Sequence, residues 1–145
     1  MPSKKNITAL SGIIREMGVM FAQIASRKTT EHASLSKQDL SAIGILGIRG
    51  ACRIGDVASL LGISQSAATP IVDRLENGGF VERQRGQDDR RVWFVNLTDA
   101  GRDVFNAENE FLREVASTML SPLTTEEQNT LIALLSRMES PEISG

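Results

Sequence analysis

Four arginines lie close together near the middle of the chain, and their chemistry suits contact with a nucleic acid: Arg83, Arg85, Arg90 and Arg91. Only Asp88 and Asp89 oppose them within this segment. Guanidinium groups are attracted into narrow minor grooves, which Arg90 and Arg91 could reach. Asp89 would repel a phosphate, so we expect it to hold Arg91 through a charge-assisted hydrogen bond. A solvated charged hairpin would explain the same charge pattern.

A second set of polar residues lies upstream, on one face of a predicted helix. Apolar residues at i, i+3, i+4 and i+7 predict a buried stripe made of Ala68, Ile71, Val72 and Leu75. At about 100° per residue, the opposite face carries Ser66, Thr69, Pro70 and Asp73, with Gln65 at the exposed N-terminal end. This polar face has the composition of a recognition helix that reads the major groove.

The side chains of this face predict particular contacts with DNA. Gln65 can pair with N6 and N7 of adenine, and the hydroxyls of Ser66 and Thr69 can bond to bases or phosphates. Ala67 or Pro70 could touch a thymine methyl group, while Arg74 on the flank suits a phosphate or an ion pair within the helix. The same polar surface could instead be exposed only to water.

Two short helices and a hairpin must position these residues. The first helix is predicted over Ile54–Leu61 and ends at Gly62, and Ser64 caps the second helix, which stops at Asn77-Gly78-Gly79. Two strands follow, over Phe80–Arg85 and Arg91–Leu97, around the polar turn at residues 86–90. A helix-turn-helix followed directly by an arginine-tipped hairpin is a winged helix.

The segments on either side predict further helices. Residues 7–24 carry an apolar seam at alternating spacings of three and four: Ile7, Leu10, Ile14, Met17, Phe21 and Ile24. This seam fits a helix that packs against a partner subunit, although an ordinary core helix remains an alternative. Ser36 caps a helix that ends near Gly50. Within it, Gly44 and Gly47 are expected to permit close packing rather than leave room for a ligand.

Two more helices are predicted after the hairpin. Thr98 caps a long helix that reaches Met119, and Pro122 then breaks the chain. Thr124 and Glu127 form a capping box for a final apolar helix. The fold class is therefore mainly α with a small β-wing, in one domain over residues 1–145. Its winged lobe covers about residues 36–102, and the dimerisation helices cover about 6–30 and 103–140.

The run DRRVWFVNLT at residues 89–98 matches the pattern D-x-R-x-x-x-V-x-L-T at every fixed position, and this is the wing pattern of the multiple-antibiotic-resistance repressor (MarR) family. Residues 57–64 and 71–81 resemble the first motif helix and the recognition-helix exit of that family. The resemblance implies a dimer whose terminal helices associate while two winged lobes grip one DNA duplex. It also implies that Asp89 and Arg91 act as a functional pair and that Arg85 binds a phosphate.

Two residues depart from the family pattern. Arg53 stands where a Ser, Thr or Asp cap is expected. Pro70 stands in the recognition helix where a long polar residue is common, and it crowds the Ser66 carbonyl. A local bend is therefore expected at Pro70, which complicates any transfer of base contacts from the family.

Composition and charge narrow the class of protein. The net charge is −2, but residues 1–52 carry +4, residues 53–102 are neutral and residues 103–145 carry −6. No uninterrupted apolar run is long enough for a membrane span or a signal peptide, so a cytoplasmic protein is expected. The single cysteine, Cys52, excludes an internal disulfide and a multi-cysteine zinc site.

The sequence gives little support for a catalytic site. His32 is the only histidine, has no Cys or acid at ligand spacing, and is expected on the surface. Cys52 has no adjacent base, so a buried inert thiol is favoured over a redox switch. No catalytic or metal site and no cofactor are expected.

These patterns predict a homodimeric, sequence-specific regulator of transcription that binds double-stranded DNA at an inverted-repeat operator. We expect a repressor that a small-molecule effector releases, since members of the family often bind small aromatic acids or other amphipathic ligands. Two alternatives stay open. One is a winged-helix protein-interaction module that does not bind DNA, and the other is a thiol redox sensor that uses Cys52.

Overall fold

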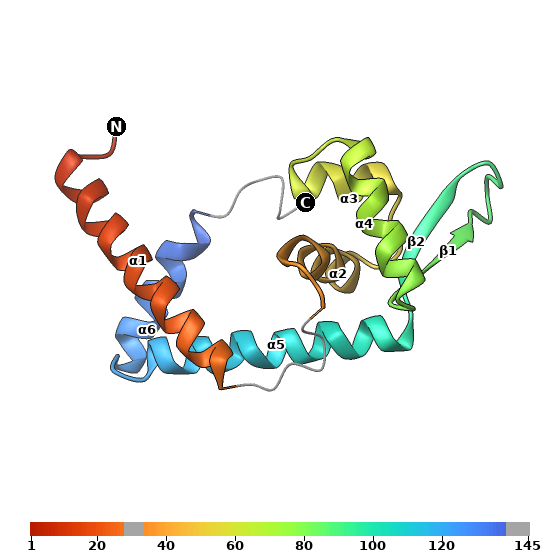
Figure 1. The fold of residues 1–145 in the computed structure, drawn as a ribbon. Helices are drawn as coiled ribbons and strands as arrows, with labels where there is room; N and C mark the ends of the chain where they lie inside the picture. Colours follow the sequence, from red (N-terminus) through yellow and green to blue (C-terminus); the bar gives the residue numbers. More distant parts are fainter. Residues whose placement is uncertain (28–33, 139–145) are drawn as a thin grey trace.

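The computed structural model describes residues 1–27 and 34–138. These residues form six helices and one hairpin: α1 (Lys4–Ser26), α2 (Lys37–Arg49), α3 (Ile54–Leu61), α4 (Gln65–Asn77), β1 (Val81–Arg85), β2 (Trp93–Leu97), α5 (Asp99–Leu120) and α6 (Thr125–Ser136). The predicted fold class, mainly helical with a small β-wing, is confirmed. In Figure 1, α2, α3, α4 and the hairpin gather at one end of α5, and α1 and α6 lie toward its other end.

The helix-turn-helix consists of α3 and α4, with the predicted bounds. Gly62 ends α3 in the left-handed conformation at φ 69°, where glycine avoids the Cβ clash of other residues. The Ser64 hydroxyl caps α4 by accepting from the Ala67 N–H at 3.2 Å. At the start of α3, the Arg53 side chain makes no capping bond. The Asp56 carboxylate instead accepts from the Arg53 N–H at 3.3 Å.

The wing is an antiparallel hairpin in which Val81 pairs with Leu97 and Arg85 pairs with Trp93. Both strands begin one or two residues later than predicted. Phe80 is still engaged at the end of α4, where its N–H donates to the Leu75 carbonyl at 2.8 Å. Arg91 and Val92 belong to the turn, because the Val92 carbonyl accepts from the Gly86 N–H and thereby closes the hairpin loop.

An unpredicted bridge joins the segment before α3 to the wing. The Cys52 N–H donates to the Val95 carbonyl at 3.0 Å, and the Val95 N–H donates to the Cys52 carbonyl at 2.7 Å. This antiparallel pair lies on the side of β2 away from β1. It fixes the beginning of α3 beside the wing.

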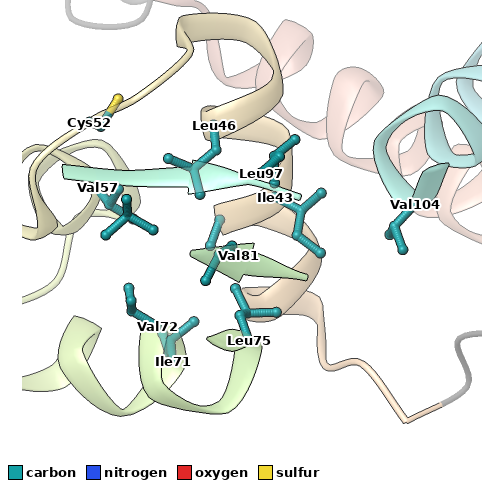
Figure 2. Close-up of a cluster of buried hydrophobic side chains, with 12 residues drawn as sticks. Ile43, Leu46, Cys52, Val57, Ile71, Val72, Leu75, Val81, Leu97 and Val104 are labelled. Carbon is teal, nitrogen blue, oxygen red and sulfur yellow. The ribbon is translucent and has the colours of Figure 1, made fainter. Parts of the chain in front are cut away.

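One apolar core holds the winged lobe together. It contains three of the four residues of the predicted α4 stripe, with residues from α2, α3, the hairpin and α5: Ala42, Ile43, Leu46, Cys52, Val57, Ile71, Val72, Leu75, Val81, Val95, Leu97 and Val104. The fourth, Ala68, is also buried. Figure 2 shows these side chains converging between α2, α4 and the two strands. The polar face of α4 must therefore point away from the core.

The two glycines of α2 differ in their surroundings. A Cβ at Gly47 would overlap the ring of Phe105 on α5, so the expected close helix packing is confirmed there. A Cβ at Gly44 would meet no atom within 4 Å apart from its chain neighbours and the backbone of α2 itself. Within the described residues, no side chain or neighbouring element therefore packs closely against Gly44, and the packing explanation is wrong for this glycine.

The terminal helices make few contacts within the described chain. Ile24 is the only buried residue of α1, and α6 has none. The exposed large apolar side chains of these two helices are Ile7, Leu10, Ile13, Ile14, Val19, Ile132, Leu134 and Leu135. Figure 1 shows both helices standing away from the winged lobe. The expected lobe and dimerisation boundaries along the chain stay predictions.

By length and composition, α1 is apolar enough to cross a membrane, and 6% of its most apolar stretch is buried. A single helix of this length and composition is weak evidence for a membrane span, and α1 contains no uninterrupted apolar run of that length. Arg15 and Glu16 lie near the middle of this helix. A charged residue at the centre of a spanning helix costs about 2.5–3.5 kcal/mol, which opposes insertion of α1 into a bilayer.

Candidate nucleic-acid interface

The polar face of α4 is exposed along the predicted recognition surface. Gln65, Ser66 and Pro70 are exposed, whereas Thr69 is half-buried. The Ser66 and Ser64 hydroxyls lie 3.1 Å apart, and the Thr69 hydroxyl donates to the Gln65 carbonyl at 3.0 Å. Thr69 therefore offers mainly its oxygen as an acceptor. The amide group of Gln65 remains the most versatile of these polar groups at the helix start.

The Arg74 side chain pairs with a residue of another helix, α2, rather than with a residue of its own helix, α4. Its Nη2 lies 2.9 Å from Oδ1 of Asp39, the one buried charged residue among those described. The prediction of an ion pair within α4 is therefore wrong. Asp39 also accepts from the Ser36 N–H at 3.0 Å in the capping box of α2, so this carboxylate fixes α4 against the start of α2. The predicted phosphate contact of Arg74 stays a prediction.

Arg83 has a role that the sequence does not reveal. It reaches from β1 to α4, where it pairs with Asp73 at 2.6 Å and with Glu76. The hydrogen bond to Asp73 and the nearby Glu76 raise the pKa of Arg83 above its ordinary value. The pair neutralises Asp73, which would otherwise present a bare negative charge on the recognition face. The cluster of opposite charges is visible in the sequence, but their pairing is not.

The predicted bond between Asp89 and Arg91 is present at the wing. Nε of Arg91 lies 3.1 Å from Oδ1 of Asp89, and Nη2 lies 3.2 Å from Oδ2. The Arg91 N–H also donates to Oδ1 at 3.0 Å. These bonds hold the pKa of Asp89 below its ordinary value. The Arg91 side chain is 91% exposed, so its position is set by Asp89 and not by burial.

The remaining wing arginines lie beside this pair. Arg85 donates through Nη1 to the Arg90 carbonyl at 3.1 Å, and its guanidinium carbon lies 4.7 Å from the centre of the Trp93 ring. Stacking on Trp93 orients the planar guanidinium. Arg90 lies at the tip of the wing. The structure thus brings Arg85, Arg90 and Arg91 together on one hairpin.

A hollow of about 390 Å³ lies between the wing and the start of α3. Among its lining residues are Arg53, Arg85, Gly86, Asp89 and Phe94. The Arg53 guanidinium carbon lies 5.9 Å from the centre of the Phe94 ring. This concave surface joins the wing to the helix-turn-helix. In the sequence, Arg53 stands out only as an unusual cap.

Cys52 is buried, as predicted for an inert thiol. Burial and the nearby Asp56 raise its pKa above the ordinary thiol value, so it stays protonated at neutral pH. The thiol also lies 3.3 Å from the Gly50 carbonyl. These features oppose the thiolate reactivity that a redox sensor needs.

The described part of the chain holds no candidate metal site. Among residues 1–27 and 34–138, no group of three or more His, Cys, Asp or Glu side chains could hold a metal ion. His32, expected on the surface, lies outside the described residues.

Comparisons of sequence agree with this arrangement. The sequence model of the MarR family matches residues 35–93, which contain the helix-turn-helix, β1 and the turn of the hairpin. The uncharacterized HTH-type transcriptional regulator YpoP of Bacillus subtilis (strain 168) is 30% identical over 105 residues, which are 72% of this chain and 74% of that protein.

Solved structures show the same architecture. Streptococcus pneumoniae FabT, determined in complex with DNA, superposes with a TM-score of 0.78 at 20% identity and covers 94% of each chain. Bordetella bronchiseptica BpsR, studied for the regulation of its DNA binding by 6-hydroxynicotinic acid, has a TM-score of 0.64 at 21% identity. That alignment covers 91% of this chain and 99% of BpsR. At these identities the likeness concerns the fold.

Proposed function

The chain belongs to the MarR family of DNA-binding transcriptional regulators, and we propose that it acts as a homodimeric repressor that releases an inverted-repeat operator when a small effector binds. Membership places it among regulators rather than enzymes. The observation that carries the proposal is the wing, where Asp89 holds an Arg91 side chain that is 91% exposed. Because Asp89 already restricts the Arg91 side chain, little further conformational entropy would be lost when this arginine enters a minor groove.

The proposed division of labour follows from the positions of the exposed side chains. Gln65, Ser66, Thr69 and Pro70 on α4 would face base edges in the major groove, with Arg74 at the flank. Arg90 and Arg91, with Asp89 as the positioning partner, would occupy the adjacent minor groove. Arg85, stacked on Trp93, would meet a phosphate.

A dimer is proposed because α1 and α6 lack a core of their own. Their apolar side chains are exposed along both helices, and helices with unpaired apolar faces bury them against a partner. Two-fold symmetry of the dimer would then give an operator with inverted half-sites, about 10 base pairs apart or a multiple of that spacing. We also propose that the protein works in the cytoplasm, where its DNA target lies.

Release by a small effector is proposed from the resemblance to the family. BpsR is a similar protein whose DNA binding is regulated by 6-hydroxynicotinic acid. In this chain, a Cβ at Gly44 of α2 would meet no neighbouring element within 4 Å, so this face of α2 is open to a ligand. A small aromatic acid or another amphipathic molecule fits this role, and no metal or cofactor is required.

The proposal is tested by selecting bound duplexes from a random pool with the full-length protein. We expect an inverted repeat, and we expect Arg90→Ala or Arg91→Ala to weaken binding without changing the melting temperature. Arg85→Ala should flatten the slope of log affinity against log salt by about 0.9 for each phosphate that the variant no longer neutralises. Absence of salt-dependent binding to any duplex would favour the protein-interaction module. An unsymmetrical footprint at full affinity would exclude the two-fold operator.

The Asp89→Ala variant distinguishes positioning from simple electrostatics. We expect it to bind the selected operator roughly fivefold more weakly, although it removes a negative charge, because Arg91 loses three hydrogen bonds to Asp89. Asp88→Ala is the matched control, since it removes the same charge from the same turn. Fluorescence anisotropy at fixed physiological salt measures both variants. Tighter binding by Asp89→Ala than by wild type would show that Asp89 only repels the DNA.

A further inference from the structure

Arg53 occupies a helix-cap position but does not act as a cap. Its side chain makes no capping bond to α3, and Asp56 supplies the bond to the Arg53 N–H. The residue is exposed, and its guanidinium carbon lies 5.9 Å from the centre of the Phe94 ring on β2. Its long, charged side chain is therefore available for a contact outside the lobe.

Backbone bonds and close contacts hold Arg53 between the recognition helix and the wing. On one side, the preceding residue Cys52 pairs with Val95 of β2 through two hydrogen bonds. On the other side, Oε1 of Gln65 lies against Gly55, only 3.3 Å from where a Cβ would stand. The start of α3 thus touches the reading end of α4, and Figure 1 shows α3 beside α4 at the end of the molecule that carries the hairpin.

This position has a geometric consequence for bound DNA. If α4 lies in the major groove and the wing enters the adjacent minor groove, one sugar–phosphate strand divides the two grooves. That strand must cross the surface between Gln65 and the wing. We infer that Arg53 binds this strand, as a phosphate anchor between the two reading elements. The inference rests on the proposed function.

The surrounding charges allow such a contact. Asp56 is engaged by the Arg53 N–H, and Asp89 is paired with Arg91. Asp88 lies on the turn that also lines the hollow. The Phe94 ring beneath the guanidinium restricts its orientation while leaving its N–H groups in the plane for phosphate oxygens. Arginine suits this position because its planar fork can bind a phosphate through two hydrogen bonds.

A backbone contact carries no sequence information of its own. Arg53→Ala should therefore weaken binding to the selected operator and to a mixed-sequence duplex by a similar factor, about tenfold. The slope of log affinity against log salt should flatten by about 0.9 for each subunit whose anchor is removed. Arg53→Lys should keep most of the slope, because it keeps the charge. Arg113→Ala on α5, where the side chain is 80% exposed, is the matched control and should change neither quantity.

Phosphate substitution locates the contact. With a duplex selected by the wild-type protein, replacing single phosphates by methylphosphonates should weaken wild-type binding at a position between the footprints of α4 and the wing. In Arg53→Ala this sensitivity should disappear, while sensitivity at other phosphates remains. Thermal melting of Arg53→Ala, followed by circular dichroism, should show an unchanged fold. If Arg53→Ala does not fold, the salt slope of Arg53→Lys and the methylphosphonate substitutions with the wild-type protein test the anchor instead.

The outcomes separate this inference from the proposed function. If wild type binds DNA, and Arg90→Ala and Arg91→Ala weaken it while Arg53→Ala keeps the wild-type slope and phosphate sensitivity, only the Arg53 anchor is overturned. If wild type binds no duplex in a salt-dependent way, both fail. The Arg53 anchor is supported if the slope of log affinity against log salt flattens and the phosphate sensitivity disappears in Arg53→Ala but not in the control variant.

Discussion

We expect Ile14→Glu to convert the protein into a monomer at micromolar concentration and to abolish tight operator binding. Ile14 lies at the centre of the apolar seam of α1, and its side chain is 59% exposed in the single chain. In a dimer it would be buried, where an unpaired carboxylate costs several kcal/mol per subunit. Because both copies carry the change, the penalty applies twice. Sedimentation velocity over a range of concentrations measures the association state directly.

Thr8→Glu is the matched control for this prediction. It places the same charge on the same helix but outside the apolar seam, and should leave the dimer intact. The operator affinity of Ile14→Glu should fall further than that of any single wing variant, because a monomer cannot bind the second half-site at the same time. A dimeric Ile14→Glu protein with wild-type affinity would show that α1 does not form the interface.

Local patterns predict most of the fold because they depend on neighbours in the sequence. The caps at Ser36, Ser64, Thr98 and Thr124 all accept from an N–H three residues ahead, as expected. Such bonds need only a short segment of chain. The buried stripe of α4 follows in the same way from the period of a helix, so the sequence also shows which residues of α4 face outward.

Pairs between elements cannot be predicted by the same reasoning. Arg74 pairs with Asp39 across 35 residues, and Arg83 crosses from β1 to α4. Both contacts depend on how the elements pack. From the sequence alone, an arginine on an exposed flank could pair with any of several carboxylates. For the same reason, Arg53 is recognisable in the sequence as a poor cap, while its place between α4 and the wing depends on the Cys52–Val95 bridge.

The second large effect is expected at Gly101, in the first turn of α5. A Cβ there would overlap the Phe80 carbonyl oxygen, which also accepts from the Thr98 N–H at 3.1 Å. The Thr98 hydroxyl is bound to the Gly79 carbonyl at 2.6 Å, so the start of α5 is fixed to the end of α4. Gly101→Ala must therefore either force these backbone segments apart or break both bonds.

We expect Gly101→Ala to lower the free energy of unfolding by about 3 kcal/mol or more, since overpacking against backbone has no flexible side chain to yield. For a domain of this size the melting temperature should fall by roughly 10 °C.

Helix propensity alone predicts the opposite sign, a gain of about 1 kcal/mol for Ala over Gly. Gly12→Ala isolates that gain, because a Cβ at Gly12 meets nothing within 4 Å and lies outside the apolar seam. Thermal unfolding of both variants at equal protein concentration gives the comparison. If Gly101→Ala melts at or above the wild-type temperature, α5 can shift away from Phe80 at little cost, and the start of α5 is not rigidly fixed to the end of α4.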